Sequence, residues 1–335
     1  MDGIIIINKE KKWTSNDVVQ KIKGMFHEKV GHTGTLDPLA TGVIPVLVGK
    51  GTLLSKYLIN HDKEYIATIK LGEKTSTGDL EGEIIEQKDV NKVILQKDFV
   101  KNTLKKFVGK ITQTPPIYSA IKVNGKKLYE YARKGQNVNI PSRNIEIYKI
   151  ELVSISQEEM TIEYKVHCSK GTYIRTLCED IAKELGTVGF MKELHRIRVG
   201  DFLIEDSLKI AELKDKEKLK HSFITIEKFF ENKEQIEIDV KELKRFLNGV
   251  KMKNPHKDGI YRIYSKKQFV GVGIVKNSSL KREIVVLEVV LWTVKKFTKK
   301  RIKTIDKYKI NQYNKKCAYQ STIWAGGRVV NGTRL

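Results

Sequence analysis

The run GHTGTLDPLATG at residues 31–42 constrains the fold of this chain more than any other segment. Its glycines, at both ends and inside, predict backbone with positive φ or a close approach to another group. Pro38 moves Asp37 out of the helical region and fixes the chain just after it. The local pattern alone favours a plain turn in which Asp37 bonds its own backbone. The rest of the chain favours the alternative, a shaped loop that aims one carboxylate.

The charge of the chain points to a polyanionic partner. The 335 residues carry a net charge of +23 with a pI near 9.6, an excess that favours nucleic acid. The three cysteines lack paired spacing, which argues against a disulfide framework or a zinc site and fits a reducing cytoplasm. No apolar stretch approaches the length of about 18 residues that spans a membrane. No glycine-rich phosphate loop is present, which argues against nucleotide cofactors.

Strand and helix patterns alternate irregularly over the first two thirds of the chain. Apolar or alternating runs predict strands at 3–7, 42–49, 65–71, 145–155 and 160–168. Helical spacing predicts helices after Thr14, at 99–108 and at 174–185. This mixture has no regular βαβ rhythm, so we expect an α+β domain built on a largely antiparallel sheet.

The last third of the chain divides into two parts. A charged stretch that loses its pattern near residue 232 predicts a domain boundary, and short strands beyond it predict a small, mostly β module at 233–292. Residues 293–335 contain 12 Lys or Arg and one acid. This basic tail is either a nucleic-acid-binding arm or a solvated extension without a role, and we favour the second.

The segment at 168–175, CSKGTYIR, marks a junction between a strand and a helix. Arg175 falls in the first turn of that helix, where a cation opposes the helix dipole. An arginine in this position either has a specific acidic partner or is an ordinary surface residue. Tyr65 and Tyr173 fit core positions equally well, whereas the neighbours of His32 are those of a loop rather than of a core histidine.

Several separate motifs occur in a fixed order along the chain: GIIIINK at 3–9, WTSND at 13–17, the aspartate run at 31–42, KEY at 63–65, PPIYSAIK at 115–122, GKKLYEYAR at 125–133, SKGTYIR at 169–175 and LHRIRVG at 194–200. Over roughly residues 1–290 this series resembles the bacterial TruB-type tRNA pseudouridine synthases. The chain departs from the family pattern at His195, where arginine is usual, and its tail after about residue 292 has no counterpart in the family.

The resemblance implies a fold and an activity. The fold is a catalytic pseudouridine synthase domain at 1–232, with an RNA-gripping insertion at about 112–142, followed by a PUA-like RNA-binding module at 233–292. The activity is isomerisation of uridine to pseudouridine at position 55, in the T loop of tRNA. It implies neither a cofactor nor a metal, and a cytoplasmic monomer that binds the T arm without a protein partner or a membrane.

The resemblance also implies roles for particular side chains. Asp37 is the nucleophile, and Arg175 keeps it ionised and aimed. The target uracil leaves its stack and packs on Tyr65, with Tyr173 as a second wall. Contacts to the substrate are further implied for His32, Leu194, Lys9 and Lys122.

Two alternatives remain at this stage. A non-catalytic RNA-binding or tRNA-folding protein explains the charge equally well, but such a protein needs no nucleophile such as Asp37. A pseudouridine synthase acting on another RNA, such as the guide-dependent relatives, is the second alternative.

Overall fold

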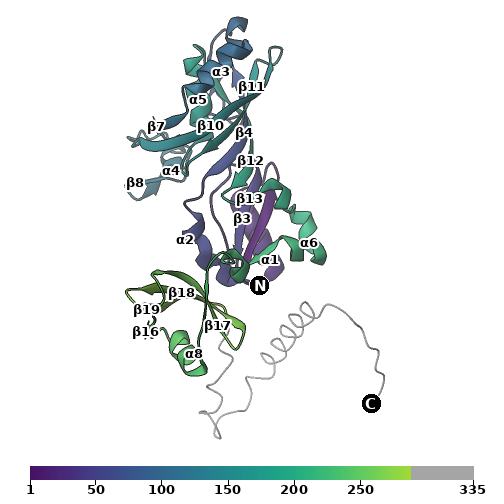
Figure 1. Cartoon of the computed structure of the whole chain (residues 1–335). Helices are drawn as coiled ribbons and strands as arrows, with labels where there is room; N and C mark the ends of the chain where they lie inside the picture. Colours follow the sequence, from purple (N-terminus) through teal and green to yellow (C-terminus); the bar gives the residue numbers. More distant parts are fainter. Residues whose placement is uncertain (288–335) are drawn as a thin grey trace, which may run out of the picture. The chain divides into compact units, whose positions relative to one another are not determined.

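The computed structural model describes residues 1–287, so the basic tail expected at 293–335 lies outside the described residues. The largest element is a sheet of ten strands (Figure 1). The pairs in this sheet are antiparallel except β12 with β3, which confirms the α+β fold on a largely antiparallel sheet. Along its main path the order is β14 (Phe223–Thr225), β1 (Gly3–Lys9), β3 (Thr41–Val48), β12 (Gly189–Val199), β4 (Lys63–Leu71), β11 (Thr161–Cys168), β10 (Arg143–Ser156) and β7 (Gly109–Gln113). Beside this path lie β2 (Val30–His32), paired with β3, and β13 (Phe202–Leu203), paired with β12.

β1 and β3 form the buried centre of one half of this sheet. Their near-continuous apolar runs are typical of strands covered on both faces, and they pair along the whole length of β1. α1 (Ser15–Phe26) covers one face, and it begins at a capping box in which Thr14 and Asp17 satisfy each other's backbone N–H groups. The predicted strands at 3–7 and 42–49 are confirmed.

The other half of the sheet is built from β4, β10 and β11. α3 (Lys97–Lys105) and α5 (Ile174–Glu184) pack with these strands and β12 in one apolar cluster. The predicted helix at 99–108 ends three residues early, because the chain turns there into β7 at Gly109, whose φ is +107°.

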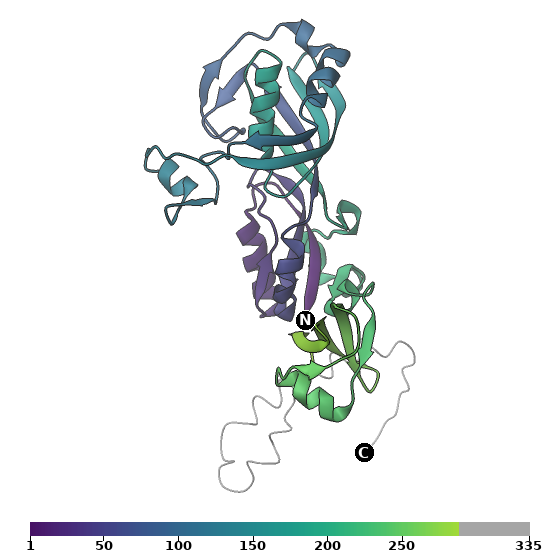
Figure 2. The same ribbon diagram turned by 60° about the vertical axis from the view of Figure 1, so that its left-hand side comes forward.

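Between β7 and β10 the chain leaves the sheet for residues 114–142. This excursion holds the short hairpin of β8 (Lys122–Val123) and β9 (Lys126–Lys127), followed by α4 (Leu128–Ala132). Figure 2 shows it projecting from the sheet. It falls within the insertion expected at about 112–142.

A separate sheet of five strands follows, with its own apolar core. Tyr57, in the short α2 (Ser55–Leu58), donates a hydrogen bond of 3.0 Å to Glu283 in this sheet. Val272 and Ile284 of the sheet join the apolar cluster that contains residues of β1 and β3. The five strands are β15 (Gln235–Glu237), β16 (Met252–Lys253), β17 (Gly259–Ser265), β18 (Gln268–Lys276) and β19 (Ser279–Val285), and the helix α8 (Val240–Leu247) lies between β15 and β16 in the sequence.

The stretch near residue 232, where the sequence pattern fades, is structured. α6 (Lys216–Ser222) and α7 (Ile226–Phe229) flank β14, and β14 extends the large sheet beyond β1. The sequence gives little sign of β14, because three residues are too few to establish a period of two.

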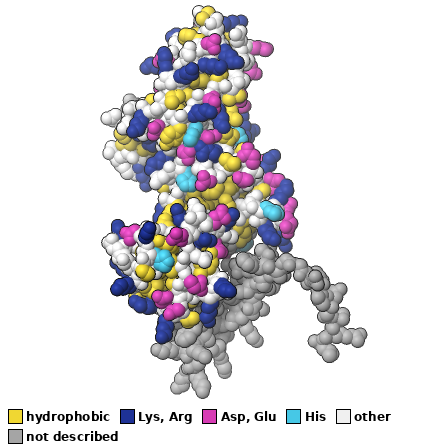
Figure 3. Space-filling view, viewed as in Figure 1, with side chains coloured by type: hydrophobic (Ala, Val, Ile, Leu, Met, Phe, Trp, Pro, Cys, Tyr) yellow, Lys and Arg dark blue, Asp and Glu magenta, His cyan; other side chains and the backbone are white. Residues whose placement is uncertain are grey.

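The surface of residues 1–287 is rich in basic side chains. On the face drawn in Figure 3, lysines and arginines are spread over both sheets and lie among acidic groups. Within the same residues, no helix is long and apolar enough to cross a membrane.

Candidate active site

The aspartate run forms a loop between β2 and β3, and neighbouring elements hold it from several sides. Ser15, at the start of α1, accepts a hydrogen bond of 2.8 Å from the backbone N of Leu36 and donates one of 3.1 Å to its carbonyl. From β1, the Lys9 ammonium donates to the carbonyl of Pro38 at 3.3 Å. The loop is therefore shaped by side chains from α1 and β1 rather than by its own turn alone.

The structure places Arg175 of α5 beside Asp37. The two side chains meet at Nε to Oδ2, 3.1 Å, and at Nη2 to Oδ1, 3.4 Å. The guanidinium also donates to the carbonyls of Thr77 at 3.1 Å and of Tyr118 at 2.9 Å. Because Tyr118 belongs to the excursion between β7 and β10, this arginine links the aspartate loop to that excursion.

A second carboxylate, Asp79, shares the same arginine and is absent from the sequence-based assignment. Its Oδ2 lies 3.5 Å from Nη1 of Arg175, and the side chains of both residues are only 6% exposed. Thr77 Oγ1 donates to Oδ1 of Asp79 at 2.5 Å, and the backbone N of Glu81 donates at 3.1 Å. The hairpin of β5 (Glu73–Thr75) and β6 (Ile84–Gln87) carries it. The available signal was an aspartate among glycines and hydroxyl residues, as in the aspartate loop.

The pKa of Asp37 is raised above the ordinary aspartate value. Burial is the largest cause, and the neighbouring charge of Asp79 adds to it. Arg175 and Lys9 lower the pKa of this carboxyl, but not enough to reverse the shift. The net direction is thus opposite to the effect expected of Arg175 alone, because burial outweighs the ion pair.

Tyr65 and Leu194 lie in the apolar cluster that also contains residues of the aspartate loop. Tyr65 is on β4 directly opposite Arg196 of β12, and Leu194 is two residues earlier on β12. Both expected substrate residues are buried, with exposures of 7% and 8%. Burial raises the pKa of the Tyr65 phenol.

Two family models match consecutive parts of the chain. Residues 22–174 match the N-terminal domain of the TruB family pseudouridylate synthases, and residues 175–249 match the C-terminal domain of tRNA pseudouridylate synthase B. The chain belongs to the TruB family.

Relatives and solved structures agree with this membership. The tRNA pseudouridine synthase B of Francisella tularensis is 43% identical over 278 residues, or 81% of this chain and 90% of the relative. That of Clostridium kluyveri is 42% identical over 289 residues, or 84% and 98%. An H/ACA RNP bound to a substrate RNA containing 2'-deoxyuridine has a chain 25% identical, with a TM-score of 0.60 and 85% of both chains covered. A Cbf5-Nop10-Gar1 complex gives 26% and 0.58, with 85% and 84% covered.

The remaining residues of the TruB pattern occupy different surroundings. Tyr173 precedes α5, where the side chain of Gln113 bonds both its N–H and its carbonyl, and Arg143 lies over its ring at 5.5 Å. Lys122 is exposed on β8. His32 is partly buried at the end of β2, and its Nδ1 has no hydrogen-bond partner in the described part of the chain. Burial lowers the pKa of this imidazole, and the charge of Arg196 lowers it further.

Lys9 differs from expectation. Its side chain is 0% exposed, and its ammonium donates to the carbonyls of Glu10, Trp13 and Pro38. Burial lowers its pKa to about 8, although the nearby charge of Asp37 acts in the opposite direction. In this structure the Lys9 ammonium therefore contacts the backbone of the aspartate loop.

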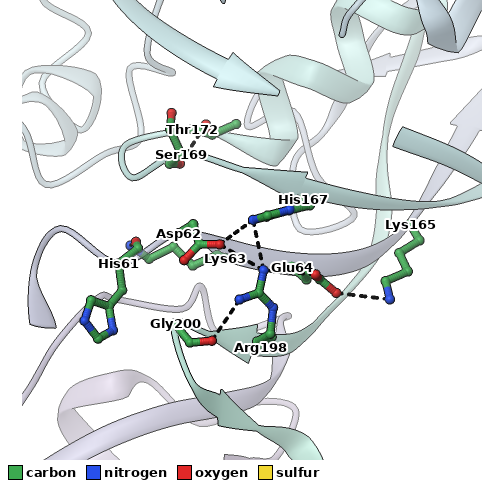
Figure 4. A network of polar contacts seen from close by, with 10 residues as sticks. All are labelled: His61, Asp62, Lys63, Glu64, Lys165, His167, Ser169, Thr172, Arg198 and Gly200. Atoms are coloured by element: carbon green, nitrogen blue, oxygen red, sulfur yellow. Dashed lines mark hydrogen bonds and ion pairs between the residues drawn. The ribbon is translucent and has the colours of Figure 1, made fainter. Parts of the chain in front are cut away.

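A second polar network in this TruB chain was not expected from the sequence (Figure 4). Arg198 of β12 contacts Asp62 at 2.9 Å and Glu64 at 3.0 Å, and Lys165 contacts Glu64 at 3.0 Å. His167 of β11 also bonds Asp62. Burial alone would raise the pKa of Asp62, but the hydrogen bonds from His167 and Arg198 outweigh it and lower the pKa.

Proposed function

We propose that this protein isomerises uridine to pseudouridine at position 55, in the T loop of tRNA, with Asp37 as the nucleophile. The contact that carries the proposal is the pair of Asp37 with a buried arginine at the centre of a TruB-family fold. The proteins named tRNA pseudouridine synthase B, which align with 81% to 84% of the chain, support tRNA as the substrate.

The isomerisation requires a nucleophile that adds to the nucleotide and later leaves. The bond between C1′ and N1 breaks, the uracil turns, and a new bond forms between C1′ and C5. The proton that C5 releases balances the one that N1 gains, so the reaction involves no net oxidation. An ionised Asp37 attacks C1′ as the bond to N1 breaks and is displaced as C5 bonds to C1′, or it adds to the ring and is eliminated after that bond has formed. The raised pKa makes this carboxylate a stronger base than a solvated one, and Arg175 directs it through two contacts.

The same proposal assigns the binding residues. Tyr65 stacks on the flipped uracil, Tyr173 forms a second wall and Leu194 forms the floor, while His32 wedges into the T loop. Tyr65 and Leu194 are buried without RNA, so this assignment requires neighbouring side chains to move when the base enters. The exposed Lys122 contacts phosphate. Lys9 is reassigned from substrate binding to support of the loop.

The proposal extends to organisation and partners. We divide the chain into a catalytic domain at 1–232, a PUA-like RNA-binding module at 233–292 and a tail at 293–335 without a catalytic role. The protein acts as a cytoplasmic monomer on the T arm and needs no protein partner. The two solved structures described above are complexes, so the oligomeric state of the pure, active protein tests this part directly.

The decisive experiment incubates the pure protein with an unmodified tRNA transcript and maps pseudouridine at each position. We expect one new pseudouridine, at position 55, and none in a transcript that carries cytidine there. Modification elsewhere would favour a different RNA substrate. Tight binding of the transcript without any modification would favour the non-catalytic RNA-binding alternative.

A further inference from the structure

Arg196 of β12 is a buried cation that the proposed mechanism does not use. Its side chain is 1% exposed and ranks among the largest fully buried ones in the described chain. Its Nε donates to the carbonyl of Val43 at 2.7 Å, and its Nη2 donates to the carbonyl of Gly34 at 3.1 Å. None of the ion pairs found within residues 1–287 includes this arginine, and its partners there are neutral: the two carbonyls and the phenol of Tyr65, whose pKa it lowers against the larger effect of burial. A buried charge is expensive, and an apolar side chain of similar volume often packs as well.

The two carbonyls that Arg196 binds belong to residues before and after Asp37 in the sequence. Gly34 precedes Asp37 by three residues, and Val43 follows it in β3. The forked guanidinium therefore joins the beginning of the aspartate loop to the strand in which the loop ends. A single rigid group with two donors can hold both sides in a fixed separation.

The backbone of Arg196 fixes the same loop at a third place. β12 runs parallel to β3 here, and Arg196 is the partner of Gly42. A Cβ at Gly42 would lie 2.1 Å from the carbonyl oxygen of Arg196, and the φ of this glycine is +104°. Only glycine allows the two backbones to approach so closely. The preceding residue adds a further contact, because His195 Nδ1 lies 2.8 Å from Thr41 Oγ1.

We propose that Arg196 is a positioning residue for the reaction, because its guanidinium clips together the two sides of the aspartate loop and so sets the direction of the Asp37 carboxylate. The proposal rests on the proposed role of Asp37. Neither lysine nor methionine at this position can make both hydrogen bonds that join the two sides of the aspartate loop. Lysine keeps the charge but offers a single point donor for two carbonyls, and methionine keeps the volume but offers no donor.

The charge of Arg196 supplies an independent signature. It lowers the pKa of His32, after the larger effect of burial. It also lowers the pKa of Lys9, where burial is again the larger cause and the charges of Asp37, Asp17 and Glu81 oppose it. Removal of the cation therefore raises the pKa of His32, whereas lysine at this position leaves it nearly unchanged.

The test compares R196M and R196K with a control on the same strand, R198M. Turnover and KM are measured with unmodified tRNA, and the imidazole of His32 is titrated by NMR, its signal identified by its loss in H32Q. Because small displacements of a reacting group reduce rates by about 100-fold, we expect R196M to lose about that factor in kcat, with KM within a few-fold. R196K should lose about 10-fold in kcat and keep the His32 pKa. R198M should keep both the wild-type kcat and the wild-type pKa of His32.

The outcomes separate this proposal from the proposed function. Absence of pseudouridine formation by the wild-type protein would overturn the function, and the position of the loop in crystals of R196K would still test the clip. Wild-type kcat in a folded R196K, or a rise in KM without a fall in kcat in R196M, would overturn the positioning role. If R196M does not fold, R196K alone decides, because it keeps the buried charge.

Discussion

Two arginines in this molecule each lie between two carboxylates, and they make an instructive pair. Arg175 contacts Asp37 at 3.1 Å and Asp79 at 3.5 Å, and Arg198 contacts Asp62 at 2.9 Å and Glu64 at 3.0 Å. The residue types and distances are similar, yet the pKa of Asp37 is raised and that of Asp62 is lowered. Proximity to an arginine alone therefore does not decide the behaviour of a carboxylate.

The difference follows from the surroundings of each pair and not from the exposure of the carboxylates, since the side chain of Asp37 is 33% exposed and that of Asp62 is 31% exposed. The arginine beside Asp37 is the more deeply buried of the two, at 6% exposed against 21% for Arg198. Around Arg198, additional donors contact both carboxylates, His167 on Asp62 and Lys165 on Glu64. In the candidate active site burial dominates, and the second carboxylate acts against the first. This contrast supports the proposal that Asp37 and Arg175 carry the chemistry, whereas Asp62 and Arg198 stabilise the fold.

The largest expected effect on turnover comes from replacing the aspartate beside Arg175, compared with the aspartate beside Arg198. D37N keeps size and hydrogen bonding but removes the charge, so we expect pseudouridine formation to vanish while tRNA affinity stays within a few-fold. D62N, the matched change in the other cluster, should retain nearly full turnover. Position-resolved mapping and a filter-binding titration measure both properties. Substantial turnover by D37N would remove Asp37 from its assigned role.

The next effect compares the two arginines. R175M should reduce turnover far more than affinity, by roughly 100-fold or more, because Asp37 loses its direction. The pKa of Asp37 should also rise further, since Arg175 lowers it, so the acidic limb of the pH profile should move to higher pH. R198M should leave the profile in place. A loss confined to affinity in R175M would identify this arginine as a phosphate contact instead.

The sequence predicts the first cluster only in part, for identifiable physical reasons. A cation in the first turn of a helix implies an acidic partner, and the glycine-rich run implies an aimed Asp37. Asp79 was missed because its pairing with Arg175 depends on how a distant hairpin packs, which no local period reveals. The short hairpin strands carry too little pattern to place it.

The burial of Lys9 and Arg196 likewise could not be predicted from the sequence. Lysine at the end of a strand and arginine between alternating residues are usually exposed, yet Lys9 and Arg196 are buried on backbone carbonyls. Their partners are carbonyls, which every residue has, so no residue type signals the contact. The strand that carries Lys9 was predicted, because β1 has a clear apolar run. The strand that carries Arg196 was not, since residues 194–200 were identified only as a motif of the family and not as part of β12.

Asp79 offers a third, intermediate test of the comparison. Its charge raises the pKa of Asp37, so D79N should lower that pKa and move the acidic limb of the pH profile to lower pH, opposite to R175M. Turnover at the optimum should fall about 10-fold, because Arg175 loses one of its anchors. The matched change E64Q in the other cluster should leave the limb where it is. Equal displacement of the limb in both variants would show that the shift is not local.

The smallest effect is on stability, and it should have opposite signs in the two clusters. The lowered pKa values of Asp62 and Glu64 mean that their ionised forms stabilise the fold above the ordinary carboxyl pKa, and that this contribution is lost as the pH falls through the lowered values. D62N should therefore reduce the free energy of unfolding at pH 7 by about 1 kcal/mol or less.

For Asp37 the sign is reversed, because a raised pKa means that the folded state favours the protonated acid. Its ionised form opposes folding increasingly as the pH rises through the raised value. D37N removes this opposition, while Arg175 keeps Asp79 as a partner, so the variant should be as stable as the wild type or more stable at pH 7. Urea unfolding of both variants at pH 7 and pH 5 measures the signs. A loss of stability in D37N equal to that in D62N would mean that the two clusters do not differ as proposed. A gain in D37N would be expected of a site that gives up stability for reactivity.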